Sequence, residues 1–62
     1  MLGENIKKAR EEIGMKQIEL AEAVGVAQSA IVYFEKGERN PSVPTLKLLS
    51  KVLGKSIDDL VK

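Results

Sequence analysis

The sequence predicts an all-α fold, a compact bundle of five short helices. Apolar residues recur at spacings of three and four, which places them on one face of a helix. In the first predicted helix these residues are Leu2, Ile6, Ala9 and Ile13. Glycine is favoured just past a helix C-terminus, and four of the five glycines stand at such positions: Gly14, Gly25, Gly37 and Gly54. No stretch alternates apolar and polar residues as a half-buried strand does.

The first three helices follow from this punctuation. We expect them from about Leu2 to Ile13, from about Gln17 to Val24 and from about Gln28 to Lys36. The segment from Glu38 to Ser42 is polar and is stiffened by Pro41. It therefore reads as a loop.

Two further helices close the chain. The fourth is expected from about Val43 to Leu53, with Pro44 tolerated only in its first turn. Its expected buried residues are Leu46, Leu49 and Leu53. The fifth is expected from Ser56 to Val61, with Ser56 as a plausible N-cap. Two acidic residues complement the positive end of its dipole: Asp58 and Asp59.

The stretch from Gln17 to Phe34 is the most informative part of the chain. Its two short helices flank Gly25, which suits a turn that needs φ > 0. Ala21 is small, as it must be if the next helix crosses closely over it. Apolar residues then lock the pair into one unit: Val24, Val26, Ile31 and Phe34. Such a unit can hold a helix in the major groove of DNA.

Composition excludes several kinds of site. The 62 residues carry a net charge of +1 and predict a single domain, residues 1–62, with one small core. Because the chain has no Cys or His, disulfides, the usual zinc ligand sets and a histidine general base are excluded. No apolar run is long enough to span a membrane and no signal-peptide pattern opens the chain, so we expect a cytoplasmic protein. We expect no cofactor, metal or small-molecule ligand.

The whole chain resembles the phage-repressor and Cro type of helix-turn-helix domain, the XRE family. The resemblance is carried by the segments LGENIKKAREEIGMKQIELAEAVGV, IVYFEKGERNPS and TLKLLSKVLGKSIDDLV. It implies five helices around one core, with the third helix in the major groove of double-stranded DNA.

The outward face of the third helix supplies the expected base contacts. The amide of Gln28 can donate and accept together at adenine, and Ser29 can bond to either kind of base edge. Val32 suits a thymine methyl group, and the hydroxyl of Tyr33 suits a base edge or a phosphate. An ordinary solvated surface is the alternative interpretation of this face.

Phosphate contacts are expected at helix starts and in the loop after the third helix. Gln17 opens the second helix, where backbone N–H groups and the helix dipole favour an anion. The resemblance implies contacts to the DNA phosphate backbone at four further residues: Lys16, Lys36, Arg39 and Asn40. For each lysine, a solvated charge without a DNA role is an equally good interpretation.

The resemblance implies a structural role for Arg10 and Glu35. It implies a partly buried ion pair between them, with a bidentate guanidinium that ties the first helix to the third. The chain departs from the family pattern where Lys16 and Ala27 precede the second and third helices, because Ser or Thr is common there. Each lost cap costs about 1 kcal/mol.

These features predict a sequence-specific regulator of transcription, repressor-like, that binds a two-fold symmetric operator as a homodimer. A protein-interaction module, such as an antitoxin or an adaptor, is the alternative. Its expected exposed apolar positions are Ile18, Val32, Leu48 and Val61. We do not expect an enzyme, because the adjacent acids point to different helical faces and a small bundle offers no deep pocket.

Overall fold

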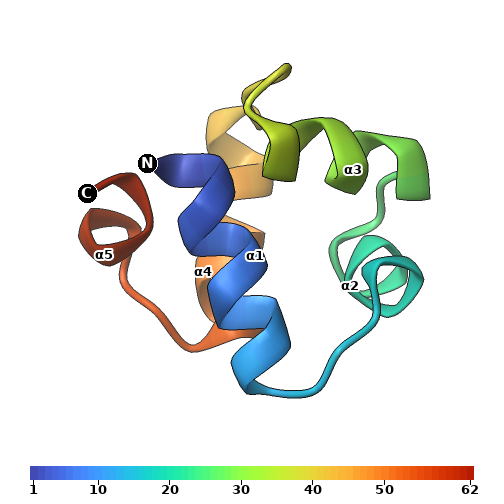
Figure 1. Cartoon of the computed structure of the whole chain (residues 1–62), viewed down its shortest axis with the longest axis horizontal. Coiled ribbons are helices and arrows are strands. Elements are labelled where there is room, and N and C mark those ends of the chain that lie inside the picture. Colours follow the sequence, from blue (N-terminus) through green and yellow to red (C-terminus); the bar gives the residue numbers. More distant parts are fainter.

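The computed structural model describes residues 1–62 and contains five helices (Figure 1). They are α1 (Leu2–Glu12), α2 (Gln17–Val24), α3 (Gln28–Lys36), α4 (Val43–Leu53) and α5 (Ile57–Val61). In Figure 1, α1 runs through the middle of the molecule, with α5 on one side and the α2–α3 pair on the other. The all-α prediction is confirmed, and the predicted bounds of α2, α3 and α4 match those observed.

Every helix contributes one face to a single core. Eleven apolar side chains are buried in it: Ile6, Ala9, Leu20, Ala21, Val24, Ala30, Ile31, Phe34, Leu49, Leu53 and Leu60. The largest fully buried side chains come one from each helix: Ile6, Leu20, Ile31, Leu49 and Leu60. Burying one such side chain contributes about 1.5–3 kcal/mol. These five positions therefore anchor the five helices.

Short polar residues begin the last two helices. The hydroxyl of Ser56 accepts the Asp59 backbone N–H at 3.0 Å, so the predicted N-cap of α5 is present and the helix proper starts at Ile57. Ser42, predicted only as a loop residue, caps α4 by accepting the Thr45 N–H at 3.3 Å. These hydroxyls satisfy N–H groups that the first turn of a helix leaves without partners.

One prediction about an inward-facing residue is wrong, and another holds only in part. The helix α1 ends at Glu12, and Ile13 is 49% exposed instead of buried. The chain turns at once through Gly14, whose φ is +72°, so Ile13 lies beyond the stripe that it would have continued. On α4, Leu46 packs against the core but remains partly exposed.

Gly3 is the only glycine inside a helix, and it marks a close approach between α1 and α3. A Cβ built at Gly3 would lie 2.8 Å from the Glu35 carbonyl oxygen and would clash with the Phe34 carbonyl oxygen. Because both neighbours are backbone atoms, no side-chain rotation relieves the clash. Gly3 thus sets the distance at which α1 supports α3.

Asn5 joins α1 to the end of α5. Its Nδ2 donates to the Leu60 carbonyl at 2.9 Å and lies within 3.3 Å of the Asp59 carbonyl. The last carbonyls of a helix have no partner inside that helix, so Asn5 supplies one from the neighbouring helix.

None of the five helices has the length and apolarity that a membrane crossing requires.

Candidate nucleic-acid interface

The helices α2 and α3 form a rigid helix-turn-helix unit. α2 is followed by Gly25, whose φ of +75° lies in the left-handed region, and the Val26 N–H donates to the Ala21 carbonyl at 3.0 Å. Ala21 is only 1% exposed, as expected for a small residue under the crossing of two helices. α3 then begins at Gln28, with Ala27 as an N-cap that offers no side-chain oxygen.

The start of α2 is closed in an unexpected way. Lys16 occupies the N-cap position, and the carboxylate of Glu19 accepts its backbone N–H at 2.8 Å. This is the returning half of a capping box, in which the third helical residue bonds back to the N-cap. The Lys16 side chain makes no hydrogen bond in the cap and is exposed. Its position suits an anion bound at the N-terminus of α2.

The predicted base-contacting residues lie together on α3, but their exposure differs. Gln28 and Ser29 are exposed in the first turn, and Tyr33 is 43% exposed one turn later. Val32 is half-buried, so it presents only part of its side chain and is less exposed than predicted. Three of the four candidates therefore form an exposed polar face. Val32 lies among them as a partly buried apolar residue.

Three of the predicted phosphate contacts lie at the end of α3 or in the loop after it. Lys36, Arg39 and Asn40 are all exposed. The Glu38 and Arg39 N–H groups both donate to the Tyr33 carbonyl, at 2.9 and 3.3 Å, which holds the loop against the helix end. The Arg39 guanidinium carbon lies 5.9 Å from the centre of the Phe34 ring, in range of a cation–π contact. Arg39 is thus held in place without its charge being neutralised.

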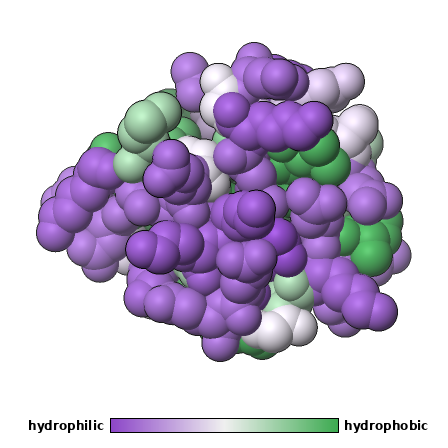
Figure 2. Space-filling view, viewed as in Figure 1, coloured by the Kyte–Doolittle hydropathy of each residue, from purple (hydrophilic) through white to green (hydrophobic).

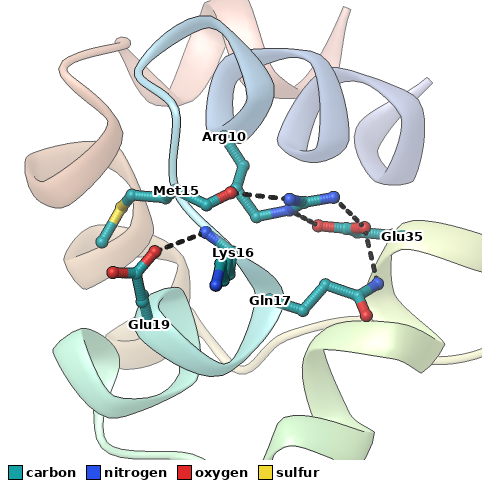
Figure 3. Close-up of polar contacts among 6 residues, drawn as sticks. All are labelled: Arg10, Met15, Lys16, Gln17, Glu19 and Glu35. Atoms are coloured by element: carbon teal, nitrogen blue, oxygen red, sulfur yellow. Dashed lines mark hydrogen bonds and ion pairs between the residues drawn. The ribbon is translucent and has the colours of Figure 1, made fainter.

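Arg10 and Glu35 form a buried bidentate ion pair between α1 and α3 (Figure 3). Arg10 Nε donates to Glu35 Oε2 at 2.6 Å, and a terminal guanidinium nitrogen donates to Oε1 at 3.2 Å. The hydrogen bonds to Glu35 raise the pKa of Arg10 above its usual value, although burial acts in the opposite direction. The second terminal nitrogen of Arg10 donates to the Met15 carbonyl at 2.8 Å, which also fixes the turn before α2.

Gln17 joins the same network from α2. Its Nε2 donates to Glu35 Oε1 at 3.1 Å, as Figure 3 shows. Gln17 was predicted as a phosphate contact, and its amide is partly occupied by this bond. Glu35 therefore receives three side-chain donors and holds three segments of the chain together: α1, the start of α2, and α3.

Sequence reasoning missed two of these features. The bond between Glu19 and Lys16 had a signal, since a Glu three residues after a helix start is the second half of a capping box even where the first half is absent. The bond between Gln17 and Glu35 had none, because residues 18 positions apart meet only after α2 and α3 have packed.

A shallow hollow of about 340 Å³ lies between α1 and α5, away from α3. Its lining is mostly polar: Asn5, Lys8, Ala9, Glu12, Lys55, Asp59 and Leu60. Lys55 and Glu12 form an exposed ion pair of 3.4 Å there. With charges of both signs at its wall, the hollow favours no particular class of ligand.

Known proteins show which family shares this architecture. The helix-turn-helix family model matches residues 6–60. An uncharacterised HTH-type transcriptional regulator of Archaeoglobus fulgidus is 42% identical over 55 residues, which are 89% of this chain and 79% of that protein. The HTH-type transcriptional regulator SinR of Bacillus subtilis is 40% identical over 62 residues, and this chain spans only 56% of its length.

Solved structures give the same result. The DNA-binding domain of the P22 c2 repressor superimposes with a TM-score of 0.94 at 37% identity, over all of this chain and 82% of that one. SinR solved in complex with DNA superimposes with a TM-score of 0.91 at 40% identity, over the whole of both chains. The P22 c2 repressor has also been solved with a synthetic operator. The match of family model, relatives and fold shows that this chain belongs to the XRE type of helix-turn-helix transcriptional regulators.

Proposed function

We propose that residues 1–62 form one domain that binds double-stranded DNA sequence-specifically as a homodimer and acts as a cytoplasmic, repressor-like regulator of transcription. The observation that carries the proposal is the open polar face of α3, where Gln28, Ser29 and Tyr33 are exposed. An α-helix fits the major groove, where each base pair presents a distinct pattern of donors and acceptors.

Residues in the first two turns of α3 contact the base edges. The Gln28 amide pairs with adenine N6 and N7, and Ser29 bonds to a neighbouring base edge. Val32, half-buried between them and Tyr33, offers its exposed part to a thymine methyl group. Tyr33 completes this set with its hydroxyl.

Phosphate binding falls to the two ends of the helix-turn-helix unit. Lys16 and Gln17 lie at the start of α2, where the helix dipole favours an anion. Lys36, Arg39 and Asn40 lie where α3 ends. Two anion-binding sites flanking one reading face position α3 in the groove without themselves reading sequence.

The size of one domain is compatible with two copies on one face of DNA. Its principal extents are 24, 23 and 19 Å, shorter than the spacing of about 34 Å between successive major grooves on one face of DNA. Two copies therefore fit side by side along one turn. We propose that they meet through the loop from Arg39 to Pro44 and the α5 segment from Ile57 to Val61, because these leave both α3 helices free.

Selection of bound duplexes from a random library, followed by salt titration, tests this function. If Lys16, Lys36 and Arg39 each meet one phosphate, a dimer neutralises six, and log affinity against log salt falls with a slope of about −5. We expect selected sites with two-fold symmetry. An affinity that does not change with salt would refute the proposal, and selected sites without symmetry would refute the dimer.

The alternative, a protein-interaction module, draws on three exposed apolar side chains. Ile18, Leu48 and Val61 are 43%, 45% and 51% exposed. On the face seen in Figure 2 the surface is largely hydrophilic and the apolar areas are small and separate. Scattered apolar residues of this kind are normal on a soluble domain, so the polar face of α3 favours DNA. The salt titration separates the two, because binding through apolar contacts lacks the steep slope.

A further inference from the structure

We propose that Glu35 is a positioning residue for DNA binding: it orients the Gln17 amide so that one N–H points to a phosphate at the start of α2. This inference rests on the proposed function, because it assigns how one of the phosphate contacts is prepared. Glu35 is 9% exposed and lies beneath the interface, so it does not reach the DNA itself.

The bond between Gln17 and Glu35 decides which end of the amide faces the carboxylate. A Gln amide has two N–H donors on nitrogen and one acceptor oxygen, and an ionised carboxylate only accepts. Gln17 Nε2 therefore faces Glu35 Oε1, at 3.1 Å. Because the amide is planar, fixing one N–H in this bond also fixes the direction of the other. Without Glu35 the amide can rotate and present its oxygen, which a phosphate repels.

Arg10 makes this arrangement compatible with a nearby phosphate. A bare carboxylate under the start of α2 would weaken the attraction of that site for an anion. The Arg10 guanidinium lies 2.6 Å from Glu35 Oε2 and neutralises its charge. The ion pair thus orients Gln17 without adding net negative charge to the site. Since Arg10 also holds the Met15 carbonyl, at 2.8 Å, the backbone leading into Gln17 is fixed by the same group.

A double-mutant cycle tests the inference. The affinity for a duplex of random sequence at low salt is measured by titration, since phosphate contacts do not depend on sequence. We expect Gln17→Ala to weaken binding about fivefold per domain in the parent protein, the value of one ordinary hydrogen bond. In the Glu35→Leu background, which has no acceptor for the Gln17 amide, the same substitution should cost less than twofold.

Lys16→Ala is the matched control. Lys16 precedes Gln17 at the same helix start and makes no side-chain bond to Glu35. Its cost should be equal in the parent and in Glu35→Leu. Equal losses from Gln17→Ala in both backgrounds would overturn the positioning role and leave the proposed function intact. Loss of the Lys16 and the Gln17 contributions together would also overturn it, since Glu35 would then only hold α2 in place.

A second measurement covers the case in which Glu35→Leu does not fold. In NMR spectra of the parent protein, one side-chain amide proton of Gln17 should be shifted downfield by the carboxylate, whereas those of exposed Gln28 should not. Adding the duplex should move the second Gln17 proton and leave the first in place. Gln17 amide protons that match those of Gln28 in the free protein would overturn the inference. If the bond is present but the duplex fails to bind, the proposed function is refuted instead.

Discussion

Replacing Gly3 by Ala should destabilise the domain, although helix propensity predicts the reverse. The new Cβ would lie 2.8 Å from the Glu35 carbonyl oxygen and closer to that of Phe34. Ordinary contacts between carbon and a carbonyl oxygen begin at about 3.3 Å, so α1 and α3 must separate by about half an ångström or more. Neither oxygen can move without moving α3.

The magnitude follows from two opposing effects. Forcing an extra methyl group into a packed site costs about 1–3 kcal/mol, and contacts with backbone place this one in the upper half of that range. Ala gains up to about 1 kcal/mol over Gly from helix propensity. The expected net loss is about 1–2 kcal/mol, against a total stability of about 3–9 kcal/mol for a chain of this length.

Urea denaturation followed by far-ultraviolet circular dichroism measures this loss. The neighbouring exposed residue Glu4 supplies the control, since Glu4→Gly should be less stable than Glu4→Ala there. At Gly3 the order of Gly and Ala should reverse. A Gly3→Ala variant as stable as the parent would show that α1 and α3 are not in close contact at this point.

Other positions give further predictions. Glu35→Ala should lose about 3–5 kcal/mol because it leaves Arg10 buried without its partner, and Arg10→Met in the same background should recover part of that loss; equal denaturation midpoints for Glu35→Ala and the parent would rule this out. Gln28→Ala should remove about 1–3 kcal/mol of discrimination at one base pair per half-site, as measured on selected and scrambled duplexes, whereas Lys36→Ala should weaken both duplexes alike and flatten the salt slope. Asn5→Ala should expose the α5 amides to faster hydrogen exchange while α3 amides keep their protection, because only α5 loses its cap.

Helix positions could be predicted from the sequence because glycine and proline punctuate it. The bounds of α2, α3 and α4 match, since Gly25, Gly37 and Gly54 end these helices with positive φ. At Ile13 the apolar spacing was misleading, because it continues past Glu12, where the helix ends just before Gly14. The apolar periodicity also could not predict how exposed Val32 is, because its partial burial depends on the packing of neighbouring helices.

The candidate site could be listed from the sequence, but its internal bonds could not. Arg10 and Glu35 were paired only through family resemblance, and the structure contains that pair. Gly3 and Gln17 show why the remainder was out of reach. The role of each depends on where the backbone or carboxylate of α3 lies after packing, and no local pattern in the sequence records that distance.

The division of labour along α3 has a consequence for how such domains diversify. Glu35, Ile31 and Phe34 are buried and hold the helix to the scaffold. The side chains of Gln28, Ser29 and Tyr33 make no hydrogen bond to the rest of the protein. Under the proposed function, exchanging these three changes the DNA sequence that is bound and removes no hydrogen bond from the scaffold. The same separation makes this helix a practical place to graft a chosen specificity.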